Sequence, residues 1–305
     1  MIDHWDQERG IHYRMNAFVP GRQTLVFVHG VSGSSSAWKA YEARFESRYN
    51  LLTYDLRGHG QSMKYPRCRD YAISHFVEDL HALLESLAID HCVLISHSFA
   101  VLIALEFLRV HQACLQGAVL LSAEFDVGRH MPARVLKTLL APVSLLERLP
   151  FHPRAGRHID YARYPDSGDW NIPRMLADVG NTTWRVYLYC TKEAYAVHAE
   201  ALLTSIRVPV LLVHGKKDTI FSVRNSSYMA TRIPTADLVV LDDADHILVL
   251  NRPGEIGDAI ERFVRRLAEN VGSASAPLRA QATAHIDEGD QRRSGDDVPD
   301  DADCL

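Results

Sequence analysis

The 305-residue sequence predicts an α/β fold, with a mostly parallel, doubly wound sheet and a helical cap inserted near the middle of the chain. Two observations lead to this prediction. Short apolar runs, typical of buried parallel strands, alternate with helical patterns over residues 10–124 and again over residues 206–270. Residues 125–205 break this alternation, because they contain helical patterns without a clear strand pattern. We therefore expect a core in two parts, 1–124 and 206–270, with the cap at 125–205.

The two parts of the core contain the strands of the sheet. The expected elements of the first part are a hairpin with strands at 11–19 and 24–28 around Pro20-Gly21, strands at 50–54, 92–96 and 118–122, and helices at about 74–87 and directly after the strand at 92–96. The second part adds two apolar runs, at 208–213 and 238–241, which are typical of buried parallel strands.

The cap is expected to consist of helices and one long loop. Helices are predicted at 133–149, 171–179 and about 183–203, and the loop at 151–169 is rich in Pro, Arg, Gly and Asp. A cap over a sheet edge shapes a substrate pocket and excludes water from it. Its aromatic residues are candidates for the pocket wall, with Trp170 and Trp184 as the predicted substrate contacts beside Tyr161, Tyr164, Tyr187, Tyr189 and Tyr195.

The chain ends in a segment of different composition. Residues 271–305 consist mainly of Ser, Ala, Gly, Asp, Gln and Arg, with almost no large apolar side chains, and several aspartates make the end acidic. Such a composition cannot bury enough apolar surface to form a core. We expect a disordered acidic tail.

Ser98 lies at the most informative turn of the chain. The apolar run at 92–95 leads into Ser96-His97-Ser98-Phe99-Ala100, and a helical pattern follows at once. A strand that turns sharply into a helix and exposes one serine oxygen is a nucleophile elbow. Only small residues fit two positions before and after that serine, and Ser96 and Ala100 are small. The sequence predicts Ser98 as a nucleophile, with the side chain of His97 pointing away from it.

Two further residues complete a candidate catalytic set with Ser98. A serine hydroxyl needs a base that takes its proton, and the base needs an acid that orients it. In this architecture the acid and then the histidine follow the serine along the chain. Asp218 comes just after the first predicted strand of the second part, and His246 comes just after the second strand. Parallel sheets bind ligands at the carboxyl ends of their strands, so we expect Ser98, Asp218 and His246 to meet there.

An oxyanion hole is expected beside Ser98. Acyl transfer needs N–H groups that point at the oxygen that becomes negative. One donor should be the N–H of Phe99, which directly follows the serine. The strand at 24–28 runs into His29-Gly30-Val31, and the N–H of Val31 is the candidate second donor. Gly30 allows the turn, and His29 and Gly30 are predicted to lie against the substrate, with His29 orienting the loop.

These motifs together resemble the α/β-hydrolase family. The resemblance covers roughly residues 10–270 and rests on five motifs in the family's order: His29-Gly30 with Trp38 downstream as the oxyanion loop, the turn Asp55-Leu56-Arg57-Gly58-His59-Gly60-Gln61-Ser62, the elbow at Ser96–Ala100, the acid loop His214-Gly215-Lys216-Lys217-Asp218, and His246 with Asn251-Arg252-Pro253. The resemblance implies a serine hydrolase that cleaves a small to medium carboxylic ester through a Ser-His-Asp triad and an acyl-enzyme, without cofactor or metal.

The chain departs from the family pattern at three positions. Ser96 and Ala100 replace the glycines of the elbow, and Asp245 stands where the family usually has glycine. Some members take the acid from the loop after an earlier strand, so Glu124 and Asp126 are alternatives to Asp218. None of these departures removes a member of the triad.

The resemblance leaves other activities open. The same triad can cleave a carbon–carbon bond, a lactone or a thioester, or transfer an acyl group. A carbon–carbon hydrolase needs a cation in the cap for the substrate carboxylate, and five arginines are available: Arg154, Arg157, Arg163, Arg174 and Arg185. Epoxide hydrolases and haloalkane dehalogenases need an aspartate where Ser98 stands, and a cofactor-free oxygenase would not need the serine. A small-molecule receptor on a hydrolase scaffold is the alternative of another class.

Composition limits the partners and the location. The net charge is −5, without a long basic run, so a small-molecule substrate is expected rather than nucleic acid. The first six residues lack the pattern of a signal peptide, and no apolar stretch approaches the ~20 residues that span a bilayer. The five cysteines are scattered, so we expect reduced thiols in a cytoplasmic protein. No cysteine or histidine cluster has the spacing of metal ligands, and the sequence does not indicate an oligomeric state.

Overall fold

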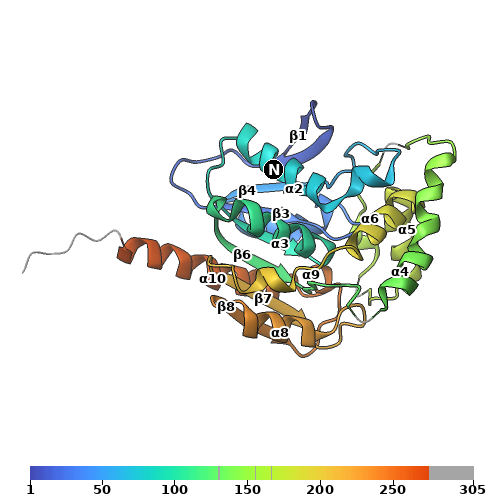
Figure 1. Ribbon diagram of the computed structural model, residues 1–305. Helices are drawn as coiled ribbons and strands as arrows, with labels where there is room; N and C mark the ends of the chain where they lie inside the picture. The colour runs from blue at the N-terminus through green and yellow to red at the C-terminus, as the bar shows by residue number, and fades with distance from the viewer. Residues whose placement is uncertain (130, 155, 166, 275–305) are drawn as a thin grey trace, which may run out of the picture.

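The computed structural model describes residues 1–129, 131–154, 156–165 and 167–274. In these residues an eight-stranded sheet is covered by helices on both faces (Figure 1). The strand order is β1-β2-β4-β3-β5-β6-β7-β8, and all neighbours from β4 to β8 pair in parallel. The predicted α/β fold with a mostly parallel sheet is confirmed.

The strands form where the sequence has short apolar runs. The parallel strands are β3 (Thr24–Val28), β4 (Asn50–Tyr54), β5 (Cys92–His97), β6 (Leu115–Leu121), β7 (Val210–Gly215) and the edge strand β8 (Ala236–Leu241). Every residue of β3, β4, β5 and β7 is buried, because helices cover both faces of a doubly wound sheet. Because these strands run parallel, their carboxyl ends lie along the same edge of the sheet.

The predicted N-terminal hairpin is wrong in its pairing. The hairpin of the structure joins β1 (Ile2–Asp6) to β2 (Ile11–Met15), and β2 then pairs antiparallel with β4. The strand at 24–28 does not pair with β2, because β4 lies between them. Pro20 and Gly21 mark a turn, but the chain passes from there into the interior of the sheet rather than back along β2.

Two hydrophobic cores lie on the two faces of the sheet. The helices α2 (Ile73–Ser86), α3 (Phe99–His111) and α8 (Val223–Arg232) contribute apolar side chains to one core. The other core is formed with α1 (Lys39–Phe45) and α10 (Pro253–Ala274). Shorter helical turns are η1 (Ser35–Trp38), η2 (Cys68–Tyr71), η3 (Gln112–Cys114) and α9 (Leu248–Asn251).

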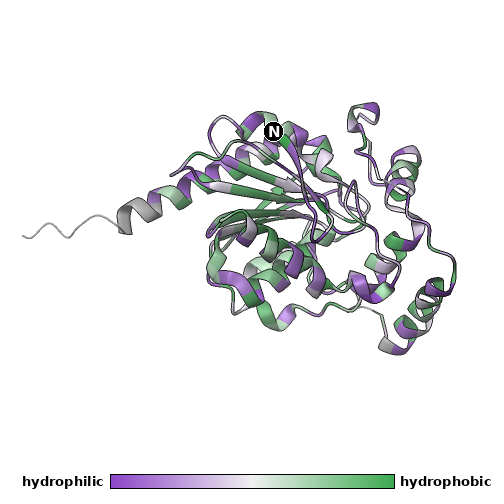
Figure 2. Cartoon of the chain, turned by 90° about the horizontal axis from the view of Figure 1, so that it is seen from above, coloured by the Kyte–Doolittle hydropathy of each residue, from purple (hydrophilic) through white to green (hydrophobic). Residues whose placement is uncertain are grey.

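The chain between β6 and β7 is helical. It contains α4 (Ala133–Leu140), η4 (Ala141–Arg148), η5 (Tyr161–Arg163), α5 (Ile172–Thr182), α6 (Trp184–Ala194) and α7 (Glu200–Leu203). Of these, α4, α5 and α6 lie together at one end of the sheet (Figure 1), and the view from above in Figure 2 shows helices gathered beyond that same end. We refer to residues 125–205 as the insertion, and its description as a separate cap domain stays a prediction.

Several boundaries differ from the sequence expectation, and the helix expected at about 183–203 is divided into α6 and α7. The helix predicted at 133–149 is an α-helix only to Leu140, and a 3₁₀ segment follows, because Pro142 lacks the N–H that an α-helix would use there. At the C-terminal end, residues 271–274 belong to α10 rather than to the expected tail. The remaining residues of that tail, 275–305, lie outside the described residues, so its disorder stays a prediction.

No helix among the described residues is both long enough and apolar enough to cross a bilayer. The four cysteines in this part of the chain are free thiols. The cytoplasmic location stays a prediction.

Candidate active site

Ser98 occupies a strained turn between β5 and α3. Its backbone has φ 55° and ψ −118°, which is an unfavourable conformation for a residue with a side chain. Ser96 and Ala100, on either side of it, are completely or almost completely buried. Larger side chains would not fit into this packed turn. The turn presents the Ser98 side chain to a cavity at the carboxyl edge of the sheet.

The structure brings Ser98, His246 and Asp218 together in one hydrogen-bonded chain. The Oγ of Ser98 lies 2.8 Å from Nε2 of His246, and Nδ1 of His246 lies 2.8 Å from Oδ2 of Asp218. The second carboxylate oxygen of Asp218 accepts the N–H groups of Ile220 and Phe221 at 2.9 and 2.8 Å. The three side chains come from three different strand-end loops, as the order of motifs predicts.

The surroundings of Asp218 favour its charged form. Burial alone would raise the pKa of this carboxyl, but hydrogen bonds with His214 and His246 and the N–H of Phe221 outweigh burial and hold the pKa well below its usual range. Asp218 is therefore an anion at neutral pH, and an anion beside His246 stabilises the imidazolium that forms when the ring takes a proton. His214 is itself held by Ser226, whose Oγ lies 2.7 Å from Nδ1 of His214.

The backbone of His246 is held at both ends of the residue. Its carbonyl accepts a hydrogen bond from Nε2 of His97 at 2.8 Å, so His97 carries its proton on Nε2. Burial, followed by the nearby charge of His246, lowers the pKa of His97 to about 3, and its ring is neutral. The expectation that His97 points away from the nucleophile is only half right, because the ring lines the cavity and contacts the histidine loop.

Asp169 holds the N–H of His246 and was missed by sequence reasoning. One oxygen of this buried carboxylate accepts the His246 N–H at 2.7 Å. The other oxygen accepts both the N–H and the Oγ1–H of Thr219, at 2.9 and 2.6 Å. Asp169 thus joins the loop of His246 to the loop of Asp218, although it comes from the insertion. It belongs to no local motif, so only the three-dimensional structure reveals this contact.

The predicted oxyanion loop lies directly against Ser98. A Cβ atom placed on Gly30 would come within 3.3 Å of Cβ of Ser98, so a glycine allows this close approach. His29 is fixed by its Nδ1–H, which donates to the carbonyl of Gly30 at 2.8 Å, and by its Nε2, which accepts the N–H of Leu56 at 3.0 Å. Val31 also lines the cavity, and among the described residues its N–H donates to no protein acceptor.

Phe99 is the other predicted oxyanion donor. It is the first residue of α3, so its N–H has no acceptor within the helix. It lines the same cavity as Ser98 and Val31. Both N–H groups are thus available at the cavity that holds the Ser98 oxygen.

The cavity lies between the sheet edge and the insertion and has a volume of about 280 Å³. Of the predicted contacts, His29 and Gly30 line it, whereas Trp170 and Trp184 do not. These two indoles are 65% and 60% exposed, and Nε1 of Trp170 donates to Thr219 on the outer surface. The wall contributed by the insertion consists mainly of Tyr161, Arg174, Met175, Val179, Tyr187 and Tyr195.

The other acidic candidates have different partners. Glu124 accepts the N–H groups of Phe125 and Asp126 and the side-chain amide of Asn225, and Asp126 pairs with His198 at 3.0 Å. Within the described residues neither carboxylate forms a hydrogen bond or ion pair with the ring of His246.

Asp245, which replaces a glycine of the family pattern, bonds to Asn251 and to the N–H of Ile247 rather than to the ring of His246. Burial and the nearby charge of Asp169 raise its pKa.

Comparison with known proteins identifies the family. A family model described as alpha/beta hydrolase fold matches residues 23–253, about three quarters of the chain. The chain belongs to the α/β-hydrolase family. It is therefore a hydrolase, and the sequence resemblance is confirmed.

Known relatives and solved structures agree with this assignment. The hydrolase is 27% identical over 255 residues to a putative carbamate hydrolase, RutD, of Pseudomonas syringae pv. syringae, covering 79% of this chain and 93% of the relative. It is 24% identical over 250 residues to 3-oxoadipate enol-lactonase 2 of Acinetobacter baylyi, covering 80% and 90%. The structure is similar to that of MGS-M2, an α/β-hydrolase enzyme from a deep-sea metagenome library of the Medee basin, with a TM-score of 0.66 and 22% identity over 86% of this chain and 97% of the other.

Proposed function

We propose that this hydrolase cleaves small to medium carboxylic esters through Ser98, His246 and Asp218. The observation that carries the proposal is the continuous hydrogen-bonded chain from Ser98 Oγ through His246 to Asp218, with both links at 2.8 Å, beside a cavity. A serine in this arrangement is activated by its base, and the base is oriented by its acid.

The proposed reaction has two acyl-transfer steps. Ser98 Oγ attacks the ester carbonyl carbon while His246 Nε2 takes the hydroxyl proton, and the N–H groups of Val31 and Phe99 hold the resulting oxyanion. His246 then gives its proton to the departing alkoxide, and an acyl-Ser98 ester remains. A water molecule that loses a proton to His246 attacks this ester. His246 then returns the proton to Oγ of Ser98, and the carboxylic acid product is released. Asp218 stays ionised throughout and keeps the imidazole in the tautomer that presents Nε2 to Ser98.

The cavity supports a substrate of limited size. Its volume of about 280 Å³ lies near the lower end of the roughly 300–1,000 Å³ that small-molecule sites occupy. Aromatic and aliphatic side chains of the insertion form much of the wall, which suits an apolar acyl or alcohol part. The names of the relatives, a putative carbamate hydrolase and an enol-lactonase, also denote hydrolysis at acyl groups.

A second candidate function is hydrolysis of a lactone or a carbon–carbon bond in a substrate that carries a carboxylate. Of the five arginines that could hold a substrate carboxylate, only Arg174 is among the described residues that line the cavity. Its Nη1 donates to Asp178 at 2.9 Å, whereas its buried Nε has no hydrogen-bond partner in the described part of the chain. A substrate carboxylate would give this Nε an acceptor.

The proposal is tested with p-nitrophenyl esters from acetyl to decanoyl. Loss of a triad nucleophile lowers kcat by about 10⁶-fold, so Ser98→Ala should fall to background while the exposed control Ser227→Ala keeps wild-type rates. Equal hydrolysis by wild type and Ser98→Ala would exclude Ser98 as the nucleophile.

The same preparations distinguish the second candidate. If it holds, Arg174→Gln raises KM for lactones that carry a carboxylate and leaves KM for neutral esters near the wild-type value. A neutral ester hydrolase would show no such preference.

A further inference from the structure

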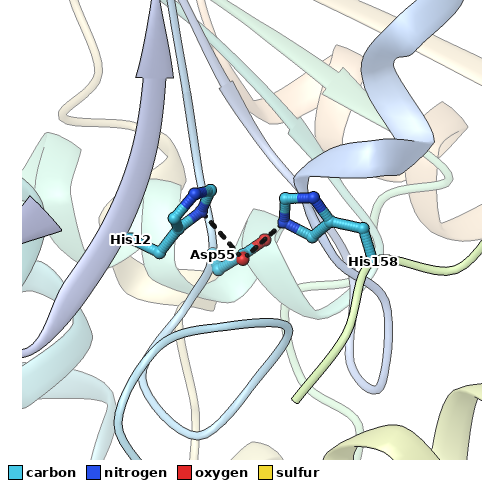
Figure 3. A group of neighbouring side chains, drawn as sticks. All are labelled: His12, Asp55 and His158. Carbon is cyan, nitrogen blue, oxygen red and sulfur yellow. Dashed lines mark hydrogen bonds and ion pairs between the residues drawn. The ribbon is translucent and has the colours of Figure 1, made fainter. Parts of the chain in front are cut away.

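A second group of polar side chains lies outside the cavity of Ser98. His12 comes from β2, Asp55 from the loop after β4, and His158 from the insertion, and Figure 3 shows both rings directed toward the carboxylate. Oδ2 of Asp55 lies 3.2 Å from Nδ1 of His12 and 2.9 Å from Nε2 of His158, and all three ligand atoms lie within 4.8 Å of one another. None of the three residues lines the cavity of Ser98.

The tautomer of His12 leaves an unused lone pair in this group. Nε2 of His12 lies 3.1 Å from a carboxylate oxygen of Asp3, which can only accept a hydrogen bond while it is ionised, so Nε2 carries the proton. In the neutral ring, Nδ1 then carries no proton and exposes a lone pair. This atom is buried and has no hydrogen-bond partner in the described residues, yet it lies 3.2 Å from an oxygen of Asp55. Two lone pairs at this distance repel each other unless a cation lies between them.

The direction of His12 Nδ1 favours a shared ion over a hydrogen bond. A proton on Nδ1 would not be aligned with Asp55, since the contact fails hydrogen-bond geometry. Ligands of one metal ion point at a common centre rather than at each other. With bonds of about 2.0–2.1 Å, two tetrahedral ligand atoms lie roughly 3.3 Å apart. The 3.2 Å between Nδ1 of His12 and Oδ2 of Asp55 is close to this spacing, whereas the 2.9 Å from Nε2 of His158 is a hydrogen-bond distance.

The residue types and charges also suit a divalent ion. Two imidazoles and one carboxylate are typical ligands of Zn²⁺ and of neighbouring transition metals. Asp3 would act as the outer carboxylate that commonly holds a metal-bound imidazole. The side-chain amide nitrogen of Gln61 lies beside the His158 ring, 3.3 Å from its Nδ1 and 3.5 Å from its Nε2. Together, Asp3 and Asp55 balance two positive charges.

We propose that His12, Asp55 and His158 bind a divalent transition-metal ion of the Zn²⁺ type. The ion ties the insertion, through His158, to the sheet, through His12 and Asp55. It also lies next to the loop that follows β3, because the second oxygen of Asp55 accepts the N–H of Ser35 at 2.7 Å. The ion has no part in the chemistry at Ser98. Its role is to hold the insertion over the sheet edge.

The experiment measures metal binding by the full-length protein. After treatment with a chelator and its removal, the protein is titrated with Zn²⁺ by calorimetry, and Co²⁺ is added to a second sample for its visible absorption spectrum. The wild type should bind one Zn²⁺ per chain tightly, with a Co²⁺ spectrum typical of a tetrahedral nitrogen and oxygen site, and its Tm should rise with Zn²⁺. His158→Ala should lose this binding, this spectrum and this rise in Tm.

Two further variants keep the test decisive. His152→Ala removes an exposed histidine of the same loop and should bind Zn²⁺ like the wild type. Asp3→Ala removes only the outer carboxylate and should weaken binding about 10–100-fold, even if His158→Ala fails to fold. The proposal is overturned if the wild type binds no Zn²⁺ at micromolar concentration, or if its affinity is unchanged in Asp3→Ala and His158→Ala. Either result would mean that a protonated His12 balances Asp55.

Discussion

Removal of the Asp169 carboxylate should disturb catalysis without removing any group that reacts. Asp169 is buried and accepts three hydrogen bonds, one from the N–H of His246 and two from Thr219. In Asp169→Ala the His246 N–H is left without an acceptor in a buried place. Such a loss costs about 1–3 kcal/mol, whereas the exposed Thr219 can turn to water. We expect the free energy of unfolding to fall by about 1–3 kcal/mol.

The effect on the rate should exceed what this loss of stability explains. His246 must stay within hydrogen-bond distance of Ser98 and Asp218 at the same time, and a displacement of about 1 Å costs roughly 10²-fold in rate. We therefore expect kcat of Asp169→Ala to fall about 10²-fold while KM for a short ester stays close to the wild-type value. Asp169→Asn keeps one acceptor oxygen and should lie between the two proteins.

The assay compares kcat, KM and urea midpoints of these variants with Asp160→Ala. Asp160 lies on the same insertion, but its carboxylate is exposed and bonds only locally, so this control should keep its kcat and lose less than about 1 kcal/mol. All kinetics are measured well below the melting temperature of each variant. A wild-type kcat in Asp169→Ala would refute the view that this carboxylate positions His246.

Three further changes have expected outcomes. Gly30→Ala places a Cβ atom 3.3 Å from Cβ of Ser98. The kcat for ester hydrolysis should therefore fall about 10²-fold with little change in Tm. An unchanged kcat would show that the loop can move away from Ser98. Arg57→Ala leaves the buried carboxylate of Asp79 without the bidentate partner that holds it at 2.6 and 2.7 Å. Urea denaturation should show that the free energy of unfolding falls by about 3–5 kcal/mol. A fall below about 1 kcal/mol would contradict this expectation. Burial raises the pKa of Asp178 from 3.8 to about 6, so the folded state binds a proton more tightly than the unfolded state, and this contribution to stability is complete below about pH 4 and is lost as pH rises through 6. The free energy of unfolding, measured by urea denaturation from pH 4 to 7, should therefore fall with rising pH by up to about 3 kcal/mol more in the wild type than in Asp178→Asn. Parallel curves for the two proteins would speak against the raised pKa.

Local sequence patterns predicted the arrangement of the site because each pattern fixes its own position on the sheet. Ser98, Asp218 and His246 each follow a short apolar run that becomes a parallel strand, and parallel strands end at one edge. Once the strands are placed, their end loops have to meet, although 148 residues separate Ser98 from His246. The small residues around Ser98 could likewise be understood from the turn alone.

The features that sequence reasoning missed depend on contacts between distant segments without a motif. Asp169 reaches His246 across 77 residues, and His158 reaches Asp55 across 103. No spacing in the sequence brings such pairs together, since the path of the insertion decides where its side chains lie. For the same reason the aromatic composition of the insertion did not show that Trp170 and Trp184 face outward, while Tyr161 lines the cavity.

The most direct test of the proposed function is to locate the acyl group on the protein. The hydrolase is mixed with a p-nitrophenyl ester, quenched in acid within the first turnover, and digested for peptide mass spectrometry. The account predicts one acyl group, on Ser98, absent from Ser98→Ala and formed much more slowly in His246→Ala. Hydrolysis by the wild type with no acyl group on Ser98, or with the group on another residue, would contradict it.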